Sequence, residues 1–308
     1  MATTDMTVQS ARPARRGVRW PRLTPGQMAA FVILVLVSIT WIVPFLWMVS
    51  TSLKTPQELV STRFWPENPT IEPYATAFFA FDRFPRWVQW FWNTAIITVL
   101  SVIGAVISTT LVAYAFARLR WPGRDLLFGI VLATMMIPAV VTMIPAFIVF
   151  SKLPAFGFQG SQNWINTFLP LTVPAFTGNA FFIFLMRQHM RGIPMELSEA
   201  ARIDGASELQ IWWHIIVPLV KPVMGVIAIF TFQGAWEDFM GPLLYLQSEN
   251  KYTLQLGLRQ FEAAAGGLPA WNELMAASLV VMIPVIVVFL AFQRYFIEGI
   301  QIQGGVKG

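Results

Sequence analysis

Cysteine is absent from the 308 residues, and histidine occurs only twice. Without cysteine the chain can form neither a disulfide bond nor a thiolate metal site. A cysteine-free chain suits an oxidising and a reducing compartment equally well, so this absence leaves the compartment open. The histidines, His189 and His214, are confined to one short stretch of the chain.

Charged residues are also scarce, at 12% of the chain against about 25% in a typical soluble domain. Hydrophobic residues make up 56%, and the mean hydropathy is +0.60. A soluble domain of this length could not bury so much apolar surface. The sequence therefore predicts an integral membrane protein, with lipid around its apolar surface.

Six apolar stretches are each long enough to cross a bilayer, which takes about 20 helical residues. We therefore expect an all-α polytopic membrane protein with six transmembrane helices. The first stretch lacks a small-residue cleavage site, so we expect it to remain as an uncleaved anchor. The expected spans are approximately residues 29–49, 91–116, 126–150, 165–186, 222–245 and 274–292.

The positive charges predict the orientation of the spans. An even number of spans places both termini on one side, and Lys and Arg concentrate in the N-terminal tail and in the loops on that side. By the positive-inside rule, both termini should be cytoplasmic. No basic and aromatic cluster typical of nucleic-acid binding occurs outside the tail. The expected organisation is a basic tail at 1–28, a six-helix transmembrane domain at 29–297 with a cytoplasmic loop at 187–221, and a cytoplasmic tail at 298–308.

The loop at 187–221, here called the coupling loop, is the most informative stretch. Pro194 suits the first position of a helix, and Gly205 suits the left-handed residue that ends one. Ser207 and Gln210 have the spacing of a capping box that starts a second helix, which Pro218 should close. A loop that only connects two spans does not need two short helices that meet at a tight turn. The pattern therefore predicts a docking element.

The coupling loop resembles the cytoplasmic signature of binding-protein-dependent ABC importer permeases. That signature is Glu-Ala-Ala, three residues, Gly, nine residues, then Ile-x-Leu-Pro. Val217 replaces the usual Leu, and Asp204 precedes the glycine in the manner of the carbohydrate branch, similar to the second permease of maltose-type systems. The matching residues are Glu199, Ala200, Ala201, Asp204, Gly205, Ile215 and Pro218.

The resemblance extends from the first span to the last residue. It includes Ala-Tyr-Ala-Phe-Ala-Arg at 113–118, Trp-Glu-Asp-Phe at 236–239, Lys-Tyr-Thr-Leu at 251–254 and Gly-Gly-Val-Lys-Gly at 304–308. It implies a bacterial cytoplasmic (inner) membrane protein that acts with a second, homologous permease. It also implies an extracytoplasmic sugar-binding protein and a dimer of ATPase subunits, which would bind ATP and Mg²⁺ and receive the coupling loop. The C-terminal tail, with Gln303, Gly304 and Gly305, would reach between those ATPase subunits.

Two adjacent carboxylates within the fifth expected span indicate a polar path. An ionised carboxylate near the bilayer centre costs about 2.5 to 3.5 kcal/mol, so such side chains usually face water or protein. Successive helical residues point about 100° apart, so only one of the two should face the path; the sequence leaves open which. Hydroxyl, amide and indole groups nearby suit sugar binding. The candidate path residues are Thr177, Asn179, Gln233, Trp236, Glu237 and Asp238.

Enzymatic function is not indicated. The chain has no Gly-rich phosphate loop and no His-Glu-x-x-His zinc pattern, and the acidic residues near the two histidines are better explained as exposed loop charges. We therefore expect no catalytic residue and no bound metal or cofactor. Three alternatives stay open: a secondary transporter driven by protons through Glu237 or Asp238, a structural scaffold, and an ABC permease for a glycerol-phosphate-like substrate. The sequence does not identify the sugar.

Overall fold

A computed structural model describes residues 24–80, 83–263 and 270–304. These ranges form helices and turns, with one isolated bridge between Pro154 and Asn163 and no strand. The all-α expectation is therefore confirmed. The chain divides into two units, residues 1–47 and 48–308, and each is described by itself. Most of the expected basic tail, residues 1–23, lies outside the described residues.

The first unit contains most of helix α1 (Pro25–Ser52). Thr24 and Gln27 cap its start reciprocally: the Thr24 N–H donates to Gln27 Oε1 at 2.9 Å, and the Gln27 N–H donates to Thr24 Oγ1. The apolar side chains that follow are exposed, as they should be in a helix that faces lipid. The helix begins four residues before the expected span.

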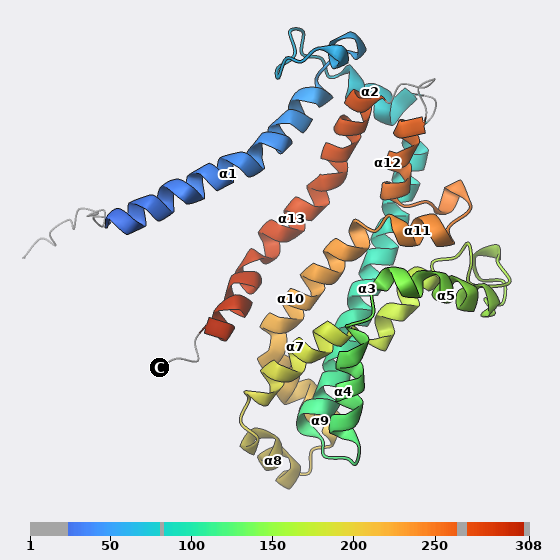
Figure 1. Ribbon diagram of the computed structural model, residues 1–308. Coiled ribbons are helices and arrows are strands. Elements are labelled where there is room, and N and C mark those ends of the chain that lie inside the picture. Colours follow the sequence, from blue (N-terminus) through green and yellow to red (C-terminus); the bar gives the residue numbers. More distant parts are fainter. Residues whose placement is uncertain (1–23, 81–82, 264–269, 305–308) are drawn as a thin grey trace, which may run out of the picture. The chain divides into compact units, whose positions relative to one another are not determined.

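The second unit holds the remaining helices, shown in Figure 1. Besides the α-helices it has 3₁₀ turns at Pro56–Val60, Phe158–Gly160, Val173–Thr177 (η4) and Glu249–Lys251, and a π-helical turn at Trp212–Ile216 (η5). The α-helices are α2 (Glu72–Phe79), α3 (Arg83–Arg118), α4 (Arg124–Thr134), α5 (Ala139–Lys152), α6 (Leu169–Thr172), α7 (Ala180–Arg191), α8 (Glu196–Ile203), α9 (Glu208–Ile211), α10 (Val217–Trp236), α11 (Met240–Tyr245), α12 (Leu254–Ala263) and α13 (Trp271–Gly304).

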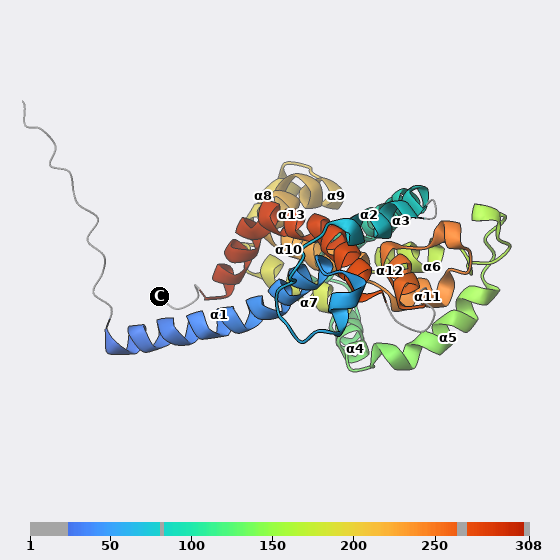
Figure 2. The ribbon, with the colours of Figure 1, turned by 90° about the horizontal axis from the view of Figure 1, so that it is seen from above.

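Six spans are confirmed if a broken pair counts as one. Five helical runs in the described ranges are long and apolar enough to cross a membrane, and α4 with α5 forms the sixth. These two helices meet at an angle of 101°, a bend visible in Figure 2. Pro138 is the N-cap of α5, and a proline there interrupts the helical hydrogen bonds. The third span is therefore a broken pair of helices and not one continuous helix.

Helix α3 is the central element of the second unit. It lies along α10 and α7, and α13 packs against the other side of α10 (Figures 1 and 2). One apolar cluster, which includes Met186, Met190 and Ile216, surrounds the C-terminal half of α3. A second, with Trp87 and Trp90, surrounds its N-terminal end. The coupling loop and α2 therefore contact opposite ends of one long helix.

The structure corrects two expected helix ends. Pro218 does not close a helix, because the helical run continues from Glu208 through the π-helical turn to Trp236. The π turn changes the hydrogen-bond register, and Pro218 then lies in the first turn of α10, where a missing N–H costs little. The expected span 222–245 is likewise interrupted, since α10 ends at Trp236 and α11 begins at Met240.

Candidate functional site

The coupling loop is a helix–turn–helix, as expected. Helix α8 ends at Ile203 with Asp204 as its C-cap, and Gly205 follows with a φ of +82°, in the left-handed region that favours glycine. Ser207 then caps α9 with a complete capping box, in which its N–H donates to Gln210 Oε1 at 2.8 Å. One detail differs: α8 begins at Glu196, so Pro194 precedes the helix instead of opening it.

Helix α8 has a buried side and an exposed side. Ser198 and Ala201 are buried, and Ala201 packs into the apolar cluster around α3. Glu199 and Ala200 are exposed, and so are the apolar side chains of Leu197 and Ile203. Exposed apolar side chains in a polar loop are typical of a docking surface. Of the other expected coupling residues, Asp204, Gly205 and Pro218 are exposed and Ile215 is half-buried.

The buried side of the coupling loop is bonded to the end of α3. The Tyr114 hydroxyl donates to Glu208 Oε2 at 2.5 Å, and Arg202 Nε donates to Glu208 Oε1 at 2.7 Å. The Glu208 hydrogen bond also raises the pKa of Arg202. Arg118 donates to the carbonyl of Pro194. Tyr114 and Arg118 belong to the family-like stretch at 113–118, but the sequence predicts no role for either residue.

Four of the expected path residues lie where α10 ends. Gln233 and Glu237 are exposed, and their side chains make no hydrogen bond within the described residues. Asp238 is half-buried and accepts from the Gly241 N–H at 3.0 Å. Trp236 is 3% exposed, and its indole donates to the Val281 carbonyl, so it packs inside the subunit and presents no platform for a sugar.

This arrangement corrects the expected geometry of the two carboxylates. Both were expected within one helix, pointing about 100° apart. Glu237 is instead the C-cap of α10, and Asp238 lies in the break before α11. The helical argument about which of them faces the path therefore does not apply. Glu237 is the better candidate for the path, because it is exposed and Asp238 is half-buried.

Thr177 and Asn179 lie at a second break, on either side of Gly178. The Thr177 hydroxyl donates to the Pro174 carbonyl at 2.7 Å, and the Asn179 side chain accepts from Phe181 N and caps α7. Both side chains are exposed. Irregular backbone inside a membrane span is tolerated where it is buried in protein or lines a water-filled cavity. The candidate path residues thus lie at two helix breaks. Within the described ranges, no hydrogen bond joins one break to the other.

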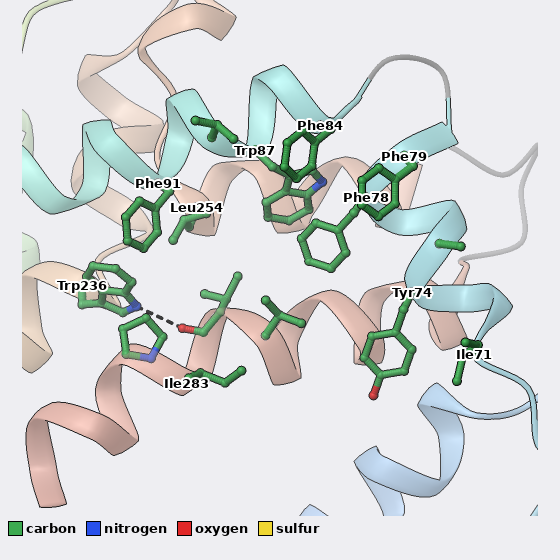
Figure 3. Close-up of a pocket in the computed structure, with 15 residues that line it drawn as sticks. Ile71, Tyr74, Phe78, Phe79, Phe84, Trp87, Phe91, Trp236, Leu254 and Ile283 are labelled. Carbon is green, nitrogen blue, oxygen red and sulfur yellow. Dashed lines mark hydrogen bonds between the residues drawn. The ribbon is translucent and has the colours of Figure 1, made fainter.

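An apolar cavity of about 720 Å³ lies between α2, α3 and α13 (Figure 3). Its rings include Phe78, Trp87 and Trp236, and the two indole N–H groups donate to backbone carbonyls of the protein. A sugar needs unoccupied hydrogen-bonding groups, and the lining offers almost none. This cavity is therefore not a candidate sugar site.

The end of the second unit opposite the coupling loop carries a connection that no sequence motif predicts. Asn166 has a left-handed φ of +61°, and its side-chain oxygen accepts from the N–H groups of Gln247 and Ser248. Lys251 Nζ donates to the carbonyls of Gln159 and Asn166 at 2.7 and 2.6 Å. Partial burial lowers the pKa of Lys251. These bonds hold the loop before α6 against the segment after α11.

The expected C-terminal tail is only partly described. Gln303 and Gly304 are the last residues of α13, so residues 298–304 belong to this helix. Gly305 lies outside the described residues.

Comparisons with known proteins agree on one family. Residues 109–301 match the family described as "Binding-protein-dependent transport system inner membrane component". The arabinooligosaccharides transport system permease protein AraQ of Bacillus subtilis (strain 168) is 30% identical over 292 residues, which cover 94% of this chain and 98% of AraQ. The galactooligosaccharides transport system permease protein GanQ of the same organism is 31% identical, covering 91% of this chain and 95% of GanQ.

A solved structure supports the fold. The crystal structure of a bacterial ABC transporter involved in the import of the acidic polysaccharide alginate contains a chain that superimposes with a TM-score of 0.72 at 25% identity. The match covers 90% of this chain and 100% of that chain.

Proposed function

The chain belongs to the family of inner membrane components of binding-protein-dependent transport systems, and we propose on this premise that it imports an oligosaccharide as one of two permease subunits of an ATP-driven transporter. Members of this family are permeases, not catalytic subunits, and they reside in the cytoplasmic membrane as multi-pass proteins. Here ATP and Mg²⁺ bind in partner ATPase subunits, and both termini of this chain face the cytoplasm.

The coupling loop carries the proposal. A left-handed glycine and a capping box hold two short helices at a fixed angle, and Glu199 and Ala200 lie exposed on the first of them. An ATPase subunit binds this exposed side, with the small Ala200 allowing close approach. When ATP closes the ATPase dimer, the docked loop moves and the spans reorient the path between the two sides of the membrane.

The substrate class follows from the relatives and from the two helix breaks. The similar proteins named above are permeases for arabino- and galacto-oligosaccharides. Gln233 and Glu237 offer exposed hydrogen-bonding groups at the end of α10. A second, homologous permease completes the path, and a sugar-loaded extracytoplasmic binding protein docks at the end that carries Asn166 and Lys251.

Reconstitution tests this function. The chain, its second permease and its ATPase subunits are placed in vesicles with the sugar-loaded binding protein, and uptake of a labelled arabino-oligosaccharide is measured with and without ATP on the ATPase side. We expect uptake only with ATP and binding protein. Uptake driven by a proton gradient without ATP would favour a secondary transporter, and preference for sn-glycerol 3-phosphate over every sugar would contradict the substrate class.

Replacing Glu237 by alanine should lower uptake more than it lowers the amount of the chain in the membrane. The carboxylate is exposed at the end of α10, so its removal leaves no buried group unpaired. We expect uptake to fall about tenfold, as for the loss of roughly 1.4 kcal/mol of binding. Uptake is divided by membrane abundance from immunoblots, with the exposed Glu72→Ala on α2 as the matched control. If membrane abundance and uptake fell by the same factor, Glu237 would instead contribute to the stability of the chain.

Deleting residues 303–308 tests the C-terminal tail. Insertion should be unchanged because the deletion begins after the last expected span. We expect a lower ATP hydrolysis rate in response to the loaded binding protein, and an unchanged rate in its absence. Stimulation equal to that of the full-length chain would show that the tail takes no part in coupling.

A further inference from the structure

The last turns of α3 hold both halves of the coupling loop. Tyr114 and Arg118 are four residues apart, so they lie on one face of the helix. Arg118 is 3% exposed and reaches the first half, where it donates to the Pro194 carbonyl at 3.3 Å and contacts Met195 Sδ at 3.2 Å. Tyr114 is 4% exposed and reaches the second half through Glu208.

The two halves are also joined to each other. Arg202 at the end of α8 binds both carboxylate oxygens of Glu208 at the start of α9, at 2.7 and 3.3 Å. Glu208 therefore accepts from one residue of α3 and from one residue of α8. Hydrogen bonds to a charged group are among the stronger ones in proteins. Through Glu208, the angle set by Gly205 is tied to the direction of α3.

The same helix is bonded to the segment that carries Thr177. Ser101 donates to the Leu171 carbonyl at 3.2 Å, and Ser108 donates to the Ala175 carbonyl at 3.0 Å. Gly104 lies between these serines, and a Cβ added there would meet the Phe176 ring at 2.6 Å, so this ring packs directly against the backbone of α3. A rigid displacement of α3 must therefore move η4 and its exposed Thr177.

We infer that Tyr114, Arg118 and Glu208 form a clamp that transmits the movement of the coupling loop to α3, and through Ser101 and Ser108 to the helix break at Thr177. The inference rests on the proposed function, because the movement originates in the docked ATPase. The three act as positioning residues, because each holds the coupling loop against α3. Without the clamp the loop can still dock, since its exposed side is unchanged, but it turns relative to α3.

The test removes one hydroxyl. Tyr114→Phe keeps the ring in its apolar cluster and deletes the hydrogen bond to Glu208. In the complete transporter in vesicles, we expect the ATPase subunits to be recovered normally by affinity purification. The amount of arabino-oligosaccharide taken up per ATP should fall about tenfold, the change that loss of a hydrogen bond to a charged group can produce. Glu208→Gln should behave similarly, and the double variant should be no worse than either single variant.

A spectroscopic readout separates the clamp from mere stability. Since the chain has no cysteine, spin labels can be attached at Leu209→Cys on α9 and Ile107→Cys on α3, both at exposed positions. The complete transporter should give one narrow distance distribution with the clamp intact and a broad one in Tyr114→Phe. Arg118→Lys should keep part of the narrow component, and Arg118→Ala should lose it.

Tyr252→Phe is the matched control, because its hydroxyl makes no hydrogen bond within the described residues, and it should leave both readouts unchanged. A narrow distribution together with normal coupling in Tyr114→Phe would overturn the clamp. Failure of the unmodified transporter to import any sugar would instead contradict the proposed function, and the distance measurement would still test the clamp.

Discussion

Replacing Gly205 by isoleucine should abolish most ATP-dependent uptake, while the chain still reaches the membrane. Gly205 has a φ of +82°, where a side chain costs about 1 to 2 kcal/mol and a β-branched one costs more. A Cβ at this position would meet nothing within 4 Å. The expected effect therefore comes from backbone strain alone: the turn changes its angle, and α8 presents Glu199 and Ala200 in the wrong orientation.

Gly205→Asn is the matched control for this strain. Asparagine tolerates the left-handed region better than other side chains, and the open space around Gly205 admits it. Affinity purification of Gly205→Ile from membranes should recover the second permease but less ATPase subunit. Vesicle uptake should fall by a factor of about ten or more. Gly205→Asn should retain most of both. Normal ATPase recovery and uptake in Gly205→Ile would show that this turn does not orient the docking surface.

The helix–turn–helix of the coupling loop was predictable because its determinants are local. The left-handed glycine and the capping box depend on residues only a few positions apart, and both are found where the sequence places them. The apolar runs also predicted six spans, since a span is defined by its own composition. Pro138 lies inside the expected third span, but a proline there can either kink or break a helix, depending on its neighbours, so the sequence does not predict the size of the bend.

The errors concern residues whose position depends on distant parts of the chain. Trp236 was expected near a sugar, but its indole donates to Val281, 45 residues away. Tyr114 binds Glu208 across 94 residues, and nothing in the local pattern of either residue indicates the pair. Such contacts require the packed fold, which a single sequence does not provide.

Gly257→Ala should destabilise the end of the second unit opposite the coupling loop. Gly257 lies in α12, and an added Cβ would overlap the six-membered ring of Trp90 on α3. Trp90 is 2% exposed and its indole donates to the Glu249 carbonyl at 3.0 Å, so the ring has little room to move. Overpacking of this kind costs about 1 to 3 kcal/mol, although alanine is the better helix former. We expect a lower thermal unfolding temperature in detergent and less chain in the membrane.

Gly129→Ala in α4 is the matched control, because a Cβ there would meet nothing within 4 Å. This variant should unfold at the original temperature or slightly above it, since alanine favours the helix. Trp90→Phe should make room for the new methyl group, so Gly257→Ala should lower the unfolding temperature little in that background. Such non-additivity would identify the contact between position 257 and Trp90 as the cause. If Gly257→Ala unfolds at the same temperature as the unmodified chain, Trp90 can shift without cost, and the close approach of α12 to α3 does not fix the structure at that end.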